Sequence, residues 1–210
     1  MQKKIKSVIV VAAVAALCAS TAAFAYLTNH DEKEAVFAVG NVAGILLDTP
    51  ANTSAGTYLS PGETITTSPK VQNTGKGDAV VFVEMQVPAE TVKTCTKGQD
   101  GSYTVSATAT EQALFEEVSE ISDKWKVYEA PQIVNGVETT LFVYKTVVPS
   151  ESTTEAIFNN LNVINTTSLN ENSYEVKFKA KMIQAEGIAE GELSNEELEK
   201  ASTAIAAHSL

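Results

Sequence analysis

Catalytic nucleophiles and bases are scarce in this chain. Its two His residues, His30 and His208, stand far apart in the sequence, and no His-Glu-x-x-His pair occurs, the usual helical ligand pattern of zinc proteases. Cys95 lies between Lys93 and Lys97, and such positive neighbours favour a thiolate. A Cys nucleophile also needs a His base nearby, which the spacing does not offer. We therefore predict no catalytic residue and interpret Cys95 as a small loop residue, in preference to a redox or cross-linking group.

Acidic side chains are plentiful, but their spacing matches no metal motif. The run His30-Asp31-Glu32 is able to bind a metal weakly, although a solvated polar segment is the preferred interpretation. Glu116-Glu117 and Glu196-Glu197 are expected on solvated helix surfaces. Loop Ca²⁺ sites stay open near predicted strand ends, without EF-hand spacing, at Asp48, Asp78, Asp100 and Asp123. Because Gly-rich phosphate loops and Gly-x-Ser-x-Gly elbows are also missing from the sequence, we predict no metal site and no cofactor, and an enzyme is not expected.

The first 25 residues have the pattern of a cleavable signal peptide. Lys3, Lys4 and Lys6 precede an apolar run from Val8 to about Ala19, which is short for a membrane span of about 20 residues. Ala23-Phe24-Ala25 then forms an A-x-A site. Ala23 and Ala25 are thus the predicted cleavage residues and Tyr26 the first mature residue. This predicts export, with signal peptidase as a transient partner and membrane contact only before cleavage.

The mature chain would be strongly acidic. Removing three Lys from the 15 basic residues leaves 12 Lys against 26 acidic residues, a net charge of −14, and the chain contains no Arg. Nucleic-acid binding relies on clustered Arg and Lys, so a nucleic-acid partner is not expected. Cys95 is the one Cys left after cleavage, and an internal disulfide is therefore excluded. A hydrophobic core must supply the stability of the 185 mature residues.

Most of the mature chain is patterned as β-strand. Between Tyr174 and Ala185 one face carries Tyr174, Val176, Phe178, Ala180 and Met182, while the other carries Glu175, Lys177, Lys179 and Lys181. This period of two is typical of a strand with one face on a core. Asn135-Gly136 predicts a hairpin turn before a strand over 137–148. Further strands are expected over 35–47, 64–71, 78–87 (ended by Pro88), 103–110, 127–128 and 156–165.

Two segments are predicted as helices. Over Glu111–Lys124, apolar residues recur at helical spacing. Over Ser194–His208, Ser194 and Glu197 form a capping box, and the thin apolar face predicts a marginal helix outside the core. We therefore predict a mainly β fold, a jelly-roll-like β-sandwich with a helical insertion and a C-terminal helix. The predicted organisation is a signal peptide (1–25), an extended segment (26–34), the sandwich (35–187), and a flexible polar lead with the helix (188–210).

Several motifs, in order, resemble the TasA/camelysin family of exported Firmicute proteins. Ala25-Tyr26-Leu27-Thr28-Asn29 resembles the family's signal junction, and Phe37-Ala38-Val39-Gly40-Asn41-Val42 its first strand. Pro61-Gly62-Glu63 resembles the family's Pro-Gly-Asp/Glu turn, and Asn73-Thr74-Gly75 resembles its Asn-x-Gly turn between strands. Met182–Gly187 resembles the end of its last strand. The segment from Pro88 to Asn172 carries no such signature.

The resemblance implies a secreted subunit of extracellular biofilm-matrix fibres. The mature N-terminal segment of one subunit would add as a strand to the next, which makes Tyr26, Leu27, Thr28, Asn29 and His30 the predicted assembly strand. Extended peptides do complete open sheet edges, and repeated head-to-tail contacts give filaments. The charged run Asp31–Glu34 departs from this scheme, because charges can blunt strand pairing.

Two alternatives remain open at the level of sequence. The first is a monomeric cell-surface or adhesion domain, which would stay monomeric after processing. The second is a camelysin-like metallopeptidase, which metal content and chelator-sensitive proteolysis would reveal. In each case the expected location is extracellular, in the matrix or on the cell surface.

Overall fold

The computed structural model describes residues 37–39, 42–47, 60–117, 120–167 and 174–208. The chain divides into two compact units, Met1–Lys33 and Glu34–Leu210, and all described residues belong to the second. Strands dominate this unit, and its described helix is C-terminal.

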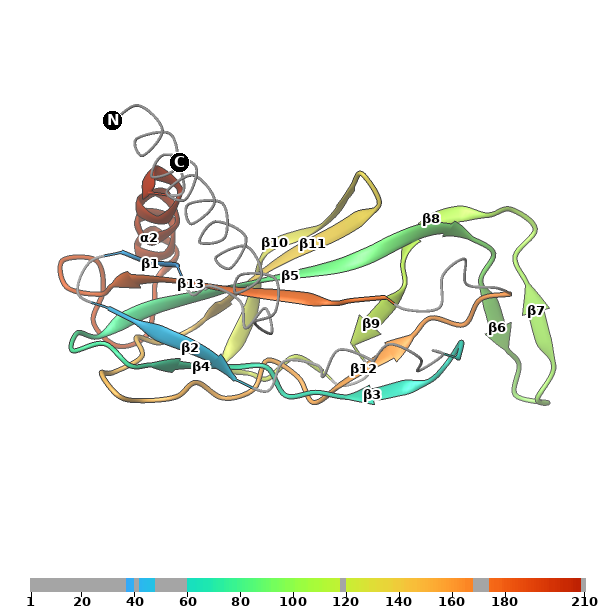
Figure 1. The fold of residues 1–210 in the computed structure, drawn as a ribbon, viewed down its shortest axis with the longest axis horizontal. Helices are drawn as coiled ribbons and strands as arrows, with labels where there is room; N and C mark the ends of the chain where they lie inside the picture. The colour runs from blue at the N-terminus through green and yellow to red at the C-terminus, as the bar shows by residue number, and fades with distance from the viewer. Residues whose placement is uncertain (1–36, 40–41, 48–59, 118–119, 168–173, 209–210) are drawn as a thin grey trace, which may run out of the picture. The chain divides into compact units, whose positions relative to one another are not determined.

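The largest sheet is built around one long central strand. Neighbours in this sheet follow the order β1-β13-β5-β11-β10, and β8 pairs with the far end of β5 (Figure 1). Its strands are β1 (Phe37–Val39), β13 (Lys177–Gln184), β5 (Ala79–Val92), β11 (Val137–Tyr144), β10 (Trp125–Val134) and β8 (Thr110–Ala113). β1 runs parallel to β13, whereas the other pairs are antiparallel. Among the described residues, the sheet therefore ends in β1 on one side and β10 on the other.

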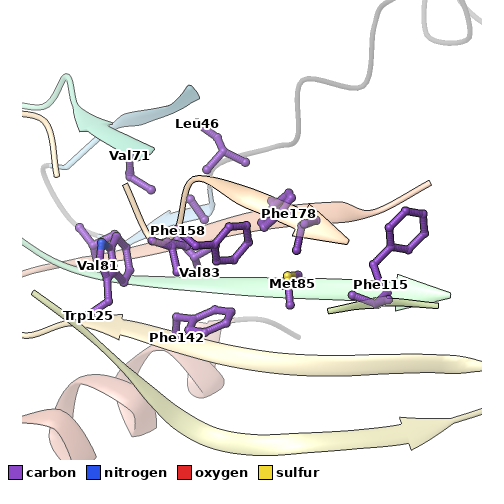
Figure 2. Packing of buried hydrophobic residues seen from close by; sticks show 14 of the residues in the cluster. Leu46, Val71, Val81, Val83, Met85, Phe115, Trp125, Phe142, Phe158 and Phe178 are labelled. Carbon is purple, nitrogen blue, oxygen red and sulfur yellow. The ribbon is translucent and has the colours of Figure 1, made fainter. Parts of the chain in front are cut away.

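Smaller sheets cover the inner face of this sheet. One has the order β3-β12-β9, another is the pair β2-β4, and β6-β7 is a separate two-stranded hairpin. Their bounds are β2 (Gly44–Leu47), β3 (Thr64–Thr66), β4 (Lys70–Asn73), β6 (Cys95–Lys97), β7 (Tyr103–Val105), β9 (Phe115–Glu117) and β12 (Asn160–Val163). Figure 2 shows Leu46 and Val71 from this layer facing Val83 and Phe178 across the core. The predicted mainly β sandwich is confirmed.

A second core lies on the opposite face of the large sheet. There α2 (Asn195–His208) packs Leu198, Ala201 and Ile205 on Phe82 and Ile183. Burying a Leu or Ile side chain is worth about 1.5–3 kcal/mol. The first half of β5 is consequently buried on both faces, with Val81 and Val83 toward one core and Phe82 toward the other. The prediction that this helix lies outside the core is wrong.

The lead into α2 is also held in place. Leu193 N–H donates to the carbonyl of Lys145 at 2.8 Å, and Val147 N–H donates to the carbonyl of Gly191 at 2.8 Å. The Ser194 hydroxyl bonds Glu197 Oε2 at 2.6 Å, and Ser194 N–H donates to the same oxygen at 2.7 Å. The capping box is thus confirmed, but the flexible polar lead is not.

The predicted helical insertion over Glu111–Lys124 is wrong, because its described residues form the end of β8, the strand β9 and, over 120–124, loop and turn. β8 pairs with β5 in the large sheet, and β9 pairs with β12 in the smaller one. The chain changes sheets at Leu114, whose N–H bonds the carbonyl of Pro88 and whose carbonyl accepts from Ile164. Leu114 and Phe115 are both buried between the sheets. Consecutive buried residues at this crossing produced the helix-like spacing.

The turn predicted at Asn135-Gly136 is confirmed, whereas the strand end predicted at Pro88 is wrong. Asn135 and Gly136 have φ values of 53° and 76° and join β10 to β11, as the Asn-Gly pair predicted. Pro88, in contrast, does not end its strand. Ala89 N–H points toward Gly136 on the β11 side. The missing N–H of Pro88 therefore points the other way, between the end of β13 and the start of β8, where the ladder needs no donor.

Candidate assembly surface

The two edges of the large sheet differ in how they are protected. β10 contains Pro131, and its register with β11 shifts between Val127 and Glu129 and again between Glu129 and Gln132. Proline and bulges are features that discourage edge-to-edge pairing. β10 is therefore a poor template for another strand.

The opposite edge, formed by β13 and β1, is regular. β13 pairs with β5 without interruption from Lys177 to Gln184. β1 covers part of its other side, with Phe37 opposite Lys181 and Val39 opposite Ile183. Among the described residues, no strand lies beside β13 along Phe178–Ala180.

The outward face of β13 carries a row of lysines, Lys177, Lys179 and Lys181, hereafter the lysine row. Lys181 Nζ lies 2.7 Å from Glu84 Oε2 on β5, and Lys179 Nζ lies 3.8 Å from Glu84 Oε1. Lys177 pairs with Glu175 at 3.5 Å. Burial alone would raise the pKa of Glu84, but the hydrogen bond and charge of Lys181 and the charge of Lys179 outweigh it and lower that pKa. One carboxylate is thus shared between two lysines.

A cavity of about 370 Å³ lies beside this row, where the last turns of α2 pass over the sheet. Phe82, Leu141 and Ile205 supply apolar surface, and Glu84 and Lys181 supply the charged rim. Small-ligand sites are commonly of this size or larger.

A buried turn at Asn73–Gly75 holds the chain at Ala43, between β1 and β2. Asn73 is fully buried, and its Nδ2 donates to the carbonyls of Gly77 (2.9 Å), Val148 (3.1 Å) and Pro149 (3.2 Å). Its Oδ1 accepts from Gly75 N–H at 3.0 Å. Thr74 and Gly75 both donate to the carbonyl of Ala43. The Asn-x-Gly motif therefore clamps the chain between β1 and β2.

The Pro-Gly-Glu motif forms a second turn. Gly62 has a φ of 78°, and its N–H bonds the carbonyl of Val163 at 2.9 Å. Glu63 Oε2 accepts from Ser60 N–H at 2.8 Å and so closes the turn. Sequence alone marked both turns by resemblance but offered no reason for Asn at position 73.

The residues predicted for cleavage and assembly, Ala23, Ala25, Tyr26, Leu27, Thr28, Asn29 and His30, lie outside the described residues, as do Asp31, Glu32 and Asp48. Cys95 is a free cysteine at the start of β6. His208 ends α2.

The predicted carboxylate groups are dispersed over the fold. Asp78 accepts from Ser150 N–H, and Asp100 accepts from Ser102 in the β6-β7 turn. Glu116 and Glu117 lie on β9 and not on a helix, while Glu196 pairs with Lys200 at 2.9 Å. Within the described ranges no three His, Cys, Asp or Glu side chains gather as metal ligands do. The same ranges contain no helix with the length and apolar character to cross a membrane.

Comparison with known proteins gives a structural likeness at low identity. No protein-family model matches this chain, and no curated protein matches it. Among solved structures, the ASH/PapD-like domain of human CEP192 (PapD-like domain 7) is similar with a TM-score of 0.20 and 11% identity, over 69% of this chain and 84% of that one. The assignment of a mainly β sandwich therefore rests on the sheets and on the two hydrophobic cores.

Proposed function

We propose that this chain is a secreted, non-enzymatic structural protein, a subunit of extracellular biofilm-matrix fibres that assemble by donor-strand addition. In this proposal the mature N-terminal segment, residues 26–34, adds as a strand to the sheet of another copy. The motifs shared with the TasA/camelysin family support the class of protein.

One structural observation carries the assembly part of the proposal. β1, the first described strand after that segment, is an edge strand on β13. The proposed donor segment precedes this edge strand in the sequence. Addition of a strand at a sheet edge supplies main-chain hydrogen bonds to unpaired backbone groups.

A monomeric cell-surface domain is the second candidate. Its support is the protected β10 edge, which limits sheet extension to one side of the molecule. The two candidates differ in one measurable property, the association state of the processed chain.

Electron microscopy with light scattering on three purified chains tests the proposal. The first starts at Tyr26, the second lacks Tyr26–Glu34, and the third retains Ala23–Ala25 ahead of Tyr26 as a matched control for a free N-terminus. We expect filaments from the first chain, monomers from the second, and slower or absent assembly from the third. Monomers from all three at high concentration and mildly acidic pH would favour the surface-domain alternative.

A further inference from the structure

The β6-β7 hairpin has one held strand and one open strand. β6 is held to the rest of the fold, because Cys95 N–H donates to the carbonyl of Asn165 at 2.8 Å and Thr94 forms a bridge with Thr166. β7 is the outer strand of the hairpin (Figure 1), and among the described residues it pairs with β6 alone. All three residues of β7 are exposed. The outer edge of β7 is therefore open to another strand.

The hydrogen bonds of the hairpin show which backbone groups this edge presents. Gly98 N–H donates to the carbonyl of Ser102 at 2.7 Å, and Ser106 N–H donates to the carbonyl of Thr94 at 2.9 Å. Hydrogen-bonded and non-hydrogen-bonded pairs alternate along an antiparallel ladder. Thr96 and Thr104, midway between those two pairs in the register, therefore form a hydrogen-bonded pair. The N–H and C=O groups of Tyr103 and Val105 consequently point away from β6.

The edge lacks the features that usually prevent strand pairing. Ser102–Thr110 contains no charged residue, no Pro and no Gly. Charged side chains, Pro and bulges are the usual protection of an edge, and β10 has both Pro131 and register shifts. Tyr103 and Val105 lie on one face of β7 and are 59% and 47% exposed. An uncharged, exposed segment of high β-propensity is suited to pairing with another such segment.

Charge and register both favour a second copy of this chain as the partner. Over 93–110 the chain carries two Lys and one Asp, a net charge of +1, whereas the chain from Tyr26 carries −14. Two copies that meet at this hairpin therefore keep most of their acidic surface out of the contact. If a two-fold axis passes through Thr104, Tyr103 of each copy stands opposite Val105 of the other. Aromatic and β-branched residues make favourable cross-strand pairs, and each pair exchanges two backbone hydrogen bonds through the outward groups.

We propose that β7 is a symmetric contact between two copies of this chain, in which it pairs antiparallel with β7 of the second copy about a two-fold axis at Thr104. The contact joins two hairpins into one ribbon. It goes beyond the proposed function, because it does not use the N-terminal segment. A contact this small holds two free copies only weakly. Many copies displayed along a filament would multiply it into a lateral contact between filaments.

Disulfide trapping tests the contact and its register. Chains from Tyr26 that carry Cys95→Ser receive either Thr104→Cys or, as the matched control, Thr96→Cys, at an exposed position on the same face of the same hairpin. At the two-fold axis the Cα atoms of the two residues 104 lie about 4.5 Å apart, within reach of a disulfide. The two residues 96 lie about 14 Å apart, across three strand spacings. After oxidation with glutathione disulfide we expect at least tenfold more disulfide dimer from Thr104→Cys. Equal yields would overturn the contact.

An edge block tests whether the backbone forms the contact. In the Thr104→Cys chain, Val105→Pro removes an outward N–H and leaves the Thr96–Thr104 pair intact, whereas Val105→Thr keeps the N–H and the β-branched shape. We expect the yield of disulfide dimer to fall at least fivefold with Val105→Pro and to change little with Val105→Thr. An undiminished yield with Val105→Pro, or an equal loss with Val105→Thr, would overturn the backbone pairing. Urea unfolding of both chains checks that the rest of the fold is unchanged.

The results separate this inference from the proposed function. Filaments from the chain that starts at Tyr26, without an excess of dimer at position 104 over position 96, would overturn the β7 contact while the proposed function stands. An excess of dimer at position 104 from a chain that forms no filaments would support the β7 contact and overturn the proposed function.

Discussion

At the scale of single residues, Asn73 is a fully buried polar side chain whose amide is hydrogen-bonded to backbone groups. Its amide makes four hydrogen bonds to backbone groups of two segments, the turn at Gly75–Gly77 and the pair Val148-Pro149. Asn73→Asp keeps the shape but removes the NH₂ donor and directs a carboxylate at carbonyl oxygens. We expect a loss of about 3 kcal/mol in the free energy of unfolding at neutral pH, measured by urea denaturation. The loss should shrink at acidic pH as the carboxyl becomes protonated. A loss below about 1 kcal/mol would contradict this account of the turn.

Gly75 is required by proximity and not by backbone angle. A Cβ at this position would lie 2.6 Å from Ala43 N and 2.7 Å from Val42 Cα, both main-chain atoms that cannot rotate away. Gly75→Ala should therefore cost about 1–3 kcal/mol through overpacking, and Thr74→Ala, at the exposed neighbour, should be nearly neutral. Thermal and urea unfolding of both variants checks this. Equal effects of the two substitutions would remove the steric explanation.

Glu138 makes the free energy of unfolding fall as pH rises, because its pKa is raised in the folded state. Burial, with the charge of Glu117 as a smaller cause, raises the pKa of Glu138 in the folded state. The protonated form is therefore favoured by folding, and stability is lost as pH rises from the usual Glu value through the raised pKa. Glu138→Gln should stabilise the protein at pH 7, by less than about 1 kcal/mol, and the difference should vanish below the usual Glu pKa. A stability difference that is constant with pH would exclude the ionisation mechanism.

Glu84 supplies the reverse case on the outer face. Its pKa is lowered in the folded state, so its contribution is present above the usual Glu value and is lost as pH falls through the lowered pKa. The half-buried Glu138 and the lysine-paired Glu84 therefore have opposite effects on stability across the acidic pH range. The pH of maximum stability depends on both carboxyls.

At the scale of elements, α2 is an integral layer of the fold. Leu198 and Ala201 are 1% and 0% exposed, and they pack on β5 and β13. Leu198→Ala should cost about 2–5 kcal/mol, while Glu199→Ala, at the exposed neighbour, should change stability little. Truncation after Glu192 should broaden or abolish cooperative unfolding, because Val80, Phe82 and Ile183 would then be exposed. Cooperative unfolding of the truncated chain at unchanged stability would contradict the role of α2 as a layer of the fold.

The elements also show what a sequence can and cannot predict. Phe178, Ala180 and Met182 predicted β13 and its buried face, because a strand with one face on a core leaves a local period of two. The apolar residues from Leu114 onward predicted a helix where the chain forms strands. The reason is that a chain that changes sheets buries neighbouring residues, and this mimics helical spacing. The thin apolar face of α2 was correctly seen, but the apolar residues Val80 and Phe82 that receive it belong to a distant strand.

The candidate site was less predictable for the same reason. The lysine row was visible in the sequence as an alternation, whereas its position at a sheet edge depends on pairings with residues about 100 and 140 positions away, such as Glu84 and Phe37. Asn73 was marked by a turn motif, but its buried partners Val148 and Pro149 come from a remote segment. Local patterns therefore predicted β13 and the turns, and long-range pairing decided which residues lie at the sheet edge and in the buried turn.

At the scale of the whole molecule, net charge opposes the proposed self-association. With 12 Lys and 26 acidic residues, copies that start at Tyr26 would repel one another at long range. Salt screens interactions beyond the Debye length, which is about 30 Å at 0.01 M and about 8 Å at 0.15 M ionic strength. Raising the salt concentration across this range should weaken the long-range repulsion more than the backbone hydrogen bonds of an added strand. We therefore expect the critical concentration of the chain from Tyr26, measured by light scattering at pH 7, to fall from 0.01 M to 0.15 M salt. A steady rise in critical concentration with salt would instead mean that attraction between opposite charges, and not relief of repulsion, governs association.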